Sequence, residues 1–286
     1  MPGSLFLVAT PIGNLEDITL RGLRVLREVD LIAAEDTRRT GRLLSHFGIT
    51  TRTTSLHAHN ESRRVPELLA QVAEGLRLAV VTDAGMPGVS DPGYLVVRHA
   101  IDAGLPLVVV PGVSALTTAL AGSGLPSDEF CFLGFAPSRS AERKRWVADA
   151  LGASSRTSVV FEAPGRVKCL LGDVLEELGD RQVVVAREMT KVHESWYRGW
   201  VSDFTGTDDG PIPERGECVV LLSNLTRPES TSVHAVSDAE VFSLFQAATD
   251  SASLSRRDAI AKVAGQLGLP KKAVYAIVER AKLSVE

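Results

Sequence analysis

The chain has 286 residues, of which 44% are hydrophobic and 23% are charged. These values are typical of globular proteins and exclude collagen-like, disordered and coiled-coil classes. The length favours two domains, with room for a small appendage, over one. The formal net charge of −4 excludes a uniform polycation, so any contact with nucleic acid must be local. Residues 251–286 carry seven Lys or Arg against three acids, a formal +4, and the preceding residues therefore carry −8.

The three cysteines lie far apart and have no spacing typical of zinc sites or disulfide frameworks, which fits a reducing cytoplasm. The first ten residues lack the basic region of a signal peptide. Residues 103–127 are uncharged, but prolines and glycines divide them into pieces too short to span a bilayer. We therefore expect a cytoplasmic protein without a membrane span.

The chain alternates short β-branched runs with amphipathic stretches, a pattern typical of βαβ units around a mostly parallel sheet. Strands are expected at residues 5–9, 31–34, 78–82 and 107–110. Helices are expected near residues 19–29, 40–47, 94–103 and 114–121. These elements predict one α/β domain over residues 1–126.

A second set of elements predicts another α/β domain over residues 127–226. Its expected strands are 130–134, 158–161, 183–187 and 218–222, its helices 141–151 and 166–178, and its hairpin arm 194–200. The boundary is placed at the Pro126-Ser127-Asp128 segment, although the helix near 114–121 could bridge the two domains.

The end of the chain predicts a small helical module over residues 237–286, after a polar linker at 226–237. Helices are expected near 238–248, 255–267 and 271–283, and Ser255 with Asp258 forms a capping-box pattern. Two helices separated by Gly268-Leu269-Pro270, with a basic bias, resemble a helix-turn-helix. Nucleic-acid binding and a purely structural bundle that docks on the rest of the chain both remain open.

Ligands of open α/β sheets bind at the carboxyl ends of the strands, so the loops there are the candidate sites. The first loop, residues 10–17, has a single glycine and gives weak support to a dinucleotide site, which requires GxGxxG. In the second loop, Glu35 and Asp36 are followed by three arginines. The planar fork of arginine suits phosphate, and the same cluster is also typical of a solvated helix face.

Two further loops carry chemistry-bearing residues. His57 and His59 have a metal-like spacing, but no third ligand stands nearby, so we expect no metal and keep the imidazoles for proton transfer or RNA contact. Residues 82–93 hold three glycines, two prolines and two aspartates, which predicts a rigid loop for close backbone approach to a ligand. Small residues at 110–115 open a helix whose first amides are left for the same ligand.

The sequence resembles the tetrapyrrole methylase superfamily, whose members bind S-adenosylmethionine in a cleft between two α/β domains. The resemblance covers nearly the whole chain through motifs at residues 9–15, 34–38, 59–61, 83–85, 90–94, 111–112, 124–127, 187–191 and 216–217. More narrowly, the motifs resemble the superfamily members that methylate ribosomal RNA. This implies 2′-O-methylation of a cytidine in the decoding region of 16S rRNA, within the small ribosomal subunit, by a homodimer.

The resemblance also implies roles for individual residues. The cofactor is expected to contact Pro11, Asp83, Gly85, Ser114, Ala115, Phe161 and Met189. The residues expected to assist deprotonation or to orient the ribose are His59, Glu61 and Lys191. The RNA is expected to contact Arg38, Arg39, Arg42 and Arg187, and in the tail Arg256, Arg257, Lys271 and Lys272. No residue stands out as the base.

Two rival functions remain. A methyltransferase for corrin-type tetrapyrroles would share the fold and cofactor, but a small substrate needs neither the arginine-rich loop nor the basic tail. A non-enzymatic regulator that binds nucleic acid through the C-terminal helices would not need the long Gly/Pro/Asp loop.

Overall fold

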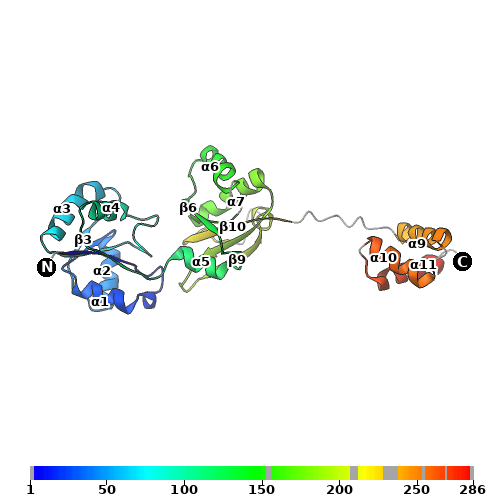
Figure 1. Ribbon diagram of the computed structural model, residues 1–286, viewed down its shortest axis with the longest axis horizontal. Helices are drawn as coiled ribbons and strands as arrows, with labels where there is room; N and C mark the ends of the chain where they lie inside the picture. Colours follow the sequence, from blue (N-terminus) through cyan, green and yellow to red (C-terminus); the bar gives the residue numbers. More distant parts are fainter. Residues whose placement is uncertain are drawn as a thin grey trace. The chain divides into compact units, whose positions relative to one another are not determined.

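The computed structural model describes residues 3–152, 156–206, 212–227, 238–252, 255–267 and 269–283. The chain divides into two compact units, Met1–Thr226 and Arg227–Glu286. The first unit contains two five-stranded sheets, and the second contains helices (Figure 1). Most of the linker predicted from the sequence, residues 228–237, lies outside the described residues.

The first sheet is parallel throughout, as the sequence predicted, with strand order β3-β2-β4-β1-β5. Its strands are β1 (Ser4–Val8), β2 (Leu31–Ala34), β3 (Thr53–Ser55), β4 (Arg77–Val81) and β5 (Leu107–Val110). In a parallel sheet all strands end at the same edge, so the loops that follow β1, β2, β4 and β5 meet there.

Helices cover both faces of the first sheet because its side chains alternate in direction. They are α1 (Leu20–Glu28), α2 (Thr37–His46), α3 (Glu61–Ala73) and α4 (Tyr94–Asp102). Helices α1 and α2 pack against one face, which includes Val81, whereas α3 and α4 pack against the other, which includes Val80. The sequence did not predict α3, whose buried stripe includes Val65, Leu68 and Val72.

The second sheet differs from the predicted parallel arrangement. Its strands are β6 (Phe130–Phe135), β7 (Thr157–Glu162), β8 (Arg181–Arg187), β9 (Ser195–Trp200) and β10 (Cys218–Thr226), in the order β6-β7-β10-β8-β9. Only β6 and β7 pair in parallel. A short connection makes β8 and β9 a hairpin, and β10 lies between β7 and β8, antiparallel to both. The expectation of a mostly parallel sheet is therefore wrong for this half.

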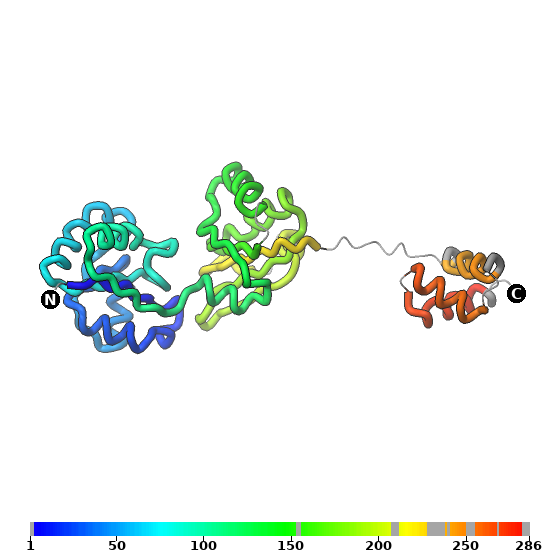
Figure 2. The backbone as a smooth tube through the Cα atoms, viewed as in Figure 1, coloured from blue at the N-terminus to red at the C-terminus, as the bar shows by residue number. Residues whose placement is uncertain are grey.

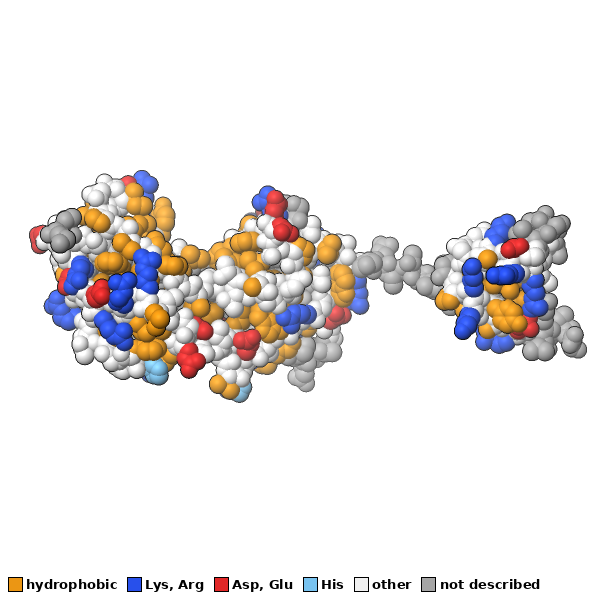
Figure 3. All heavy atoms as spheres, turned by 60° about the horizontal axis from the view of Figure 1, so that its bottom comes forward, with side chains coloured by type: hydrophobic (Ala, Val, Ile, Leu, Met, Phe, Trp, Pro, Cys, Tyr) orange, Lys and Arg blue, Asp and Glu red, His pale blue; other side chains and the backbone are white. Residues whose placement is uncertain are grey.

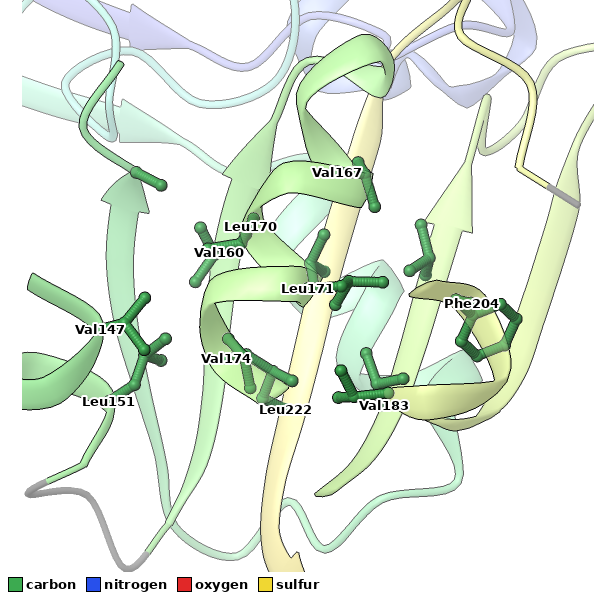
Figure 4. Close-up of a cluster of buried hydrophobic side chains, with 14 of the residues drawn as sticks. Val147, Leu151, Val160, Val167, Leu170, Leu171, Val174, Val183, Phe204 and Leu222 are labelled. Carbon is green, nitrogen blue, oxygen red and sulfur yellow. The ribbon is translucent and has the colours of Figure 1, made fainter. Parts of the chain in front are cut away.

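Helices also cover both faces of the second sheet. On one face lie α6 (Ser140–Trp146) with the π-helical turn Val147–Leu151, α7 (Pro164–Leu178) and α8 (Ser202–Thr205), around the apolar cluster of Figure 4. On the other face lies α5 (Ala115–Ser123), which packs on β8 and β10. The chain thus passes from the first sheet to the second between β5 and α5 (Figure 2). The division at residue 126 stays a prediction.

The C-terminal unit contains α9 (Asp238–Ala252), α10 (Arg256–Leu267) and α11 (Lys271–Leu283), close to the predicted ranges. Its apolar core comes from its own helices, for example Phe245, Val263 and Val274. At the predicted capping box, the Asp258 N–H donates to the Ser255 hydroxyl (3.3 Å), which itself donates to the Asp258 carboxylate (2.6 Å).

No helix within the described residues combines the length and the apolar character needed to cross a membrane.

Candidate active site

Two loops at the carboxyl edge of the first sheet are joined by backbone hydrogen bonds. The Thr10 N–H donates to the Gly85 carbonyl (2.9 Å), and the Gly85 N–H donates to the Thr10 carbonyl (3.0 Å). Gly85 has φ of +81°, a conformation that favours glycine. The loop after β1 and the loop after β4 therefore form one wall.

The loop after β4, residues 82–93, is braced at its far end. The Gly88 N–H donates to the Pro92 carbonyl (3.1 Å), and the Gly93 N–H donates to the carboxylate of Glu61 (3.0 Å). Glu61 is 7% exposed and lies in the first turn of α3. These contacts fix the path of the loop, as its composition predicted.

The loop between β8 and β9 brings the second sheet to this edge. The Asn14 N–H donates to the Thr190 hydroxyl (3.1 Å), and Thr190 has a strained backbone with φ of +66°. A Cβ on Gly13 would lie 2.6 Å from Cγ of Lys191, so only glycine allows this approach.

An apolar cavity of about 340 Å³ lies among these loops. Most of its wall is apolar, and three carboxylates, from Asp91, Glu162 and Glu217, also face it. The other lining residues are Ile12, Ala84, Gly85, Met86, Val89, Ser114, Ala115, Phe135, Phe161, Ala163, Met189, Gly216, Cys218 and Val219.

The apolar cavity brings together five of the seven residues expected to contact a cofactor. They are Gly85, Ser114, Ala115, Phe161 and Met189. Gly85 follows β4, Ser114 and Ala115 lie at the start of α5, Phe161 lies on β7, and Met189 follows β8. The Ser114 side chain makes no capping hydrogen bond to α5, so the helix begins at the cavity without a side-chain cap. The ring of Phe161 packs edge-on against Phe132 and Phe135, with centroids 4.8 and 5.7 Å away.

A second hollow of about 460 Å³ shares Ile12, Ala84 and Glu217 with the apolar cavity. We call it the basic hollow, because Arg39, Arg42 and Lys191 line it. Its remaining residues are Thr10, Pro11, Gly13, Leu15, Thr40, Leu43, Thr82 and Asp83. Pro11 and Asp83, expected at the cofactor, therefore line this hollow and not the apolar cavity.

The cations of the basic hollow differ in their partners. Arg39 pairs with Asp83 (3.4 Å), and the Lys191 ammonium donates to the carboxylates of Glu188 (2.8 Å) and Glu217 (3.0 Å). Burial alone would lower the pKa of Lys191, but these hydrogen bonds outweigh it and raise that pKa above its ordinary value. Arg42 is exposed and has no partner among the described residues.

Two groups in the apolar cavity have strongly shifted pKa values. Burial, reinforced by the negative charges of Glu35, Asp83 and Glu217, raises the pKa of Asp91 to about 7. Burial also raises the pKa of the Cys218 thiol to about 11. Asp91 lies in the predicted ligand loop, but the sequence did not single it out as a site residue.

The remaining predicted site residues of the first unit line neither space. His59 is exposed beside His57, with ring centroids 6.0 Å apart. The Arg38 guanidinium pairs with Asp36 (2.8 Å). Arg187 donates to backbone carbonyls, at 2.8 Å in the shorter contact. No cluster of three metal-ligating side chains occurs in the part of the chain that the structure describes.

The predicted RNA-contacting residues of the C-terminal unit are exposed on α10 and at the start of α11. Figure 3 shows several Lys and Arg side chains on the visible face of the C-terminal unit, among hydrophobic side chains. The Arg256 guanidinium lies 5.6 Å from the ring centroid of Tyr275 and pairs with Glu279, whereas Arg257, Lys271 and Lys272 have no partner among the described residues.

Comparison with known proteins identifies the class. Residues 4–205 match the sequence profile described as Tetrapyrrole (Corrin/Porphyrin) Methylases. The chain therefore belongs to the tetrapyrrole methylase family, as its motifs predicted. A crystal structure of uroporphyrin-III C-methyltransferase from Thermus thermophilus, complexed with S-adenyl homocysteine, shares the fold with a TM-score of 0.54. It is 18% identical and covers 77% of this chain and 97% of that chain.

Within the family, the chain belongs with the proteins named ribosomal RNA small subunit methyltransferase I. The relative from Thermotoga maritima is 48% identical over 221 residues, 77% of this chain and 98% of the relative. The relative from Halalkalibacterium halodurans is 39% identical over 277 residues, 96% of this chain and 94% of the relative, so this similarity extends over the C-terminal unit.

Proposed function

We propose that this protein transfers the methyl group of S-adenosylmethionine to the 2′-hydroxyl of a cytidine in the decoding region of 16S rRNA. The observation that carries the proposal is an apolar cavity that adjoins a basic hollow, in a chain whose relatives are named for the small-subunit ribosomal RNA. Such a pair of spaces suits two reactants, one largely apolar and one carrying phosphate.

S-adenosylmethionine fits the chemistry of the apolar cavity. Phe161 and Met189 offer apolar surface to the adenosine and methionine parts, and the start of α5 at Ser114 and Ala115 offers backbone amides. Asp91 and Glu217 place negative charge where a sulfonium cation would lie. Pro11 and Asp83 join this set from the adjoining hollow, where each is next in the chain to a residue, Ile12 or Ala84, that lines both spaces.

The basic hollow is the proposed place of the target nucleotide. Arg39 and Arg42 lie on one face of α2, where they are able to hold a phosphate, and Lys191 faces them from the loop between β8 and β9. Arg38 and Arg187 lie outside the hollow and serve flanking phosphates. Arg256, Arg257, Lys271 and Lys272 of the C-terminal unit supply a further RNA surface.

Positioning dominates the catalysis. S-adenosylmethionine supplies an electrophilic methyl group when bound. Alignment of two reactants supplies about 7–11 kcal/mol of a barrier, and the braced loops fix the walls that align them. Lys191 stays protonated and orients the ribose or its phosphate, whereas Glu61 acts through the loop that it holds. His59 lines neither space, so its part in catalysis stays a prediction.

The rival substrate, a tetrapyrrole, has weaker support. A small macrocycle does not need the unpaired Arg42 or the basic C-terminal helices, and the crystal structure of uroporphyrin-III C-methyltransferase described above is 18% identical to this chain. The enzyme acts as a homodimer on the small ribosomal subunit, in the cytoplasm, where its three free cysteines stay reduced.

The test is transfer of tritiated methyl from S-adenosylmethionine to small subunits that lack the modification, followed by nucleoside mapping. We expect label on a single 2′-O-methylcytidine. Free 16S rRNA and a tetrapyrrole acceptor run in parallel distinguish the substrate classes, and label on a base or on the tetrapyrrole alone would contradict the proposal.

A further inference from the structure

We infer that Asp91 is the proton acceptor that deprotonates the ribose hydroxyl during methyl transfer. The inference rests on the proposed function. It assigns a residue to the role of the base, for which no residue stood out in the sequence.

The position of Asp91 suits this role. Its side chain lines the apolar cavity together with the residues proposed to surround the methyl donor. It stands on the loop that Glu61 and the Thr10–Gly85 bridge hold at both ends. Ser90, directly before it, has φ of +62°, and such strain persists only where the surroundings determine the backbone. Asp91 is therefore presented to the cavity by a fixed backbone.

The other carboxylates that line the two spaces already have partners. Glu217 is ion-paired, as is Asp83, which also accepts a hydrogen bond of 3.1 Å from the Asp36 N–H. Glu162 pairs with Arg166 (3.1 Å). Asp91 alone among these four makes no hydrogen bond or ion pair with any described residue. Its oxygens are thus the ones left to accept a proton from a bound hydroxyl.

The three residues first expected to assist deprotonation are poorly placed to accept a proton. Lys191 donates to two carboxylates, which keep its ammonium protonated. Glu61 is buried and holds the Gly93 amide, and His59 is exposed outside both spaces.

The electrostatics support the geometry. A pKa of about 7 lies near the pH at which a cytoplasmic enzyme works, which is the condition for an efficient general base. The carboxylates that raise it come from three loops, after β2 (Glu35), after β4 (Asp83) and before β10 (Glu217). A bound sulfonium cation would favour the ionised form of Asp91 and lower this pKa.

The proton and electron balance is simple. The ribose oxygen forms a bond to the methyl carbon, and the carbon–sulfur bond breaks with its pair left on sulfur. The O–H proton moves to a carboxylate oxygen of Asp91, which yields a neutral carboxylic acid. Because Asp91 is only half-buried, it then releases the proton to water.

The test measures single-turnover methylation of unmodified small subunits from pH 5 to pH 9, with saturating S-adenosylmethionine. For the parent we expect a rate that rises with pH and levels off at or below about pH 7. Asp91→Asn loses about 10²–10⁴-fold in rate and the rising limb, whereas Asp91→Glu keeps the limb at a reduced rate. Asp128→Asn, an exposed control outside both spaces, behaves as the parent.

Calorimetric binding of S-adenosylmethionine and circular dichroism separate chemistry from folding. Asp91→Asn should still fold and should bind the donor with reduced affinity, because it lacks the carboxylate charge, and saturating donor then isolates the chemical step. Asp91→Ser replaces Asp91→Asn if the latter does not fold. An Asp91→Asn rate within threefold of the parent, or a parent rate that is flat over this range, overturns the inference alone. A parent that binds the donor but labels no small-subunit RNA overturns the proposed function and the inference with it.

Discussion

The carboxylate of Glu61 accepts a hydrogen bond of 3.0 Å from the backbone N–H of Gly93. This contact ties the first turn of α3 to the end of the loop that lines the apolar cavity. Glu61 therefore reaches the candidate active site only through the backbone of that loop. A residue that holds a loop and a residue that moves a proton respond differently to the same substitutions.

Glu61→Gln should retain most of the activity, because the amide oxygen still accepts from Gly93. Glu61→Ala leaves a buried N–H without its partner, which costs about 1–3 kcal/mol and loosens the loop. Methylation assays and urea denaturation of both variants check this, with Glu74→Gln on the exposed end of the same helix as the control. Equal inactivation of Glu61→Gln and Glu61→Ala would show that Glu61 takes part in proton transfer.

The raised pKa of Asp91 predicts a pH-dependent stability. The folded state favours the protonated form, so the stabilisation that this group contributes is present at acid pH and is lost as the pH rises to about 7. The unfolding free energy of Asp91→Asn minus that of the parent should therefore increase from about pH 4 to pH 7 and then stay constant. Urea denaturation at several pH values measures it, and a gap that shrinks with rising pH would contradict it.

Gly85 should be required for donor binding because it lines the apolar cavity, and this effect should be separable from any loss of stability. Gly85 and Gly104 both have positive φ, +81° and +64°, so valine at either position costs about 1–2 kcal/mol of backbone strain. Only Gly85 lines the apolar cavity. Calorimetry should show weaker S-adenosylmethionine binding for Gly85→Val and unchanged binding for Gly104→Val. Equal affinities would place the donor elsewhere.

Arg42 should contribute to RNA affinity through phosphate. Arg42→Gln should flatten the slope of log K against log salt by roughly 0.9 for a duplex or 0.7 for a single strand. Arg63→Gln removes another exposed arginine, on α3, that lines neither space and should leave the slope unchanged. Filter binding to small-subunit RNA across a salt series provides the measurement, and identical slopes for both variants would make Arg42 a solvated side chain.

Deletion of residues 228–286 should spare donor binding and weaken RNA capture. Every residue that lines the two spaces lies before Thr226, and the C-terminal unit has its own apolar core. Calorimetry with S-adenosylmethionine and methylation of small subunits measure the two effects. A truncated protein that aggregates would favour a structural role for the C-terminal helices. A soluble one that methylates at the parental rate would show that they have neither a structural role nor a role in RNA capture.

Local sequence patterns predicted most of the elements. Residues 31–34 and 107–110 coincide with β2 and β5, because short apolar runs bounded by turn residues are typical of buried strands. Helix α3 escaped prediction because Pro66 and a polar first turn obscure its apolar stripe. The direction of the strands in the second sheet could not be predicted either. It depends on long-range pairs such as Leu221 with Val159, which periodicity does not encode.

The candidate site was predicted as a set of loops and less well as individual roles. Glycines and prolines at 82–93 indicated the loop, and its backbone conformation explains them. Which acid stays unpaired was not predictable, because Asp83 and Glu217 meet their cations only in the folded chain. The division of the lining residues between two spaces depends on the same long-range contacts.

The protonated thiol of Cys218 has a consequence for the durability of the enzyme. Sulfur anions are strong nucleophiles toward alkyl groups, and Cys218 lines the cavity proposed for a methylating agent. With burial raising its pKa to about 11, the Cys218 thiol stays protonated at neutral pH. The apolar wall therefore protects the Cys218 thiol from methylation by a donor that is bound before the RNA.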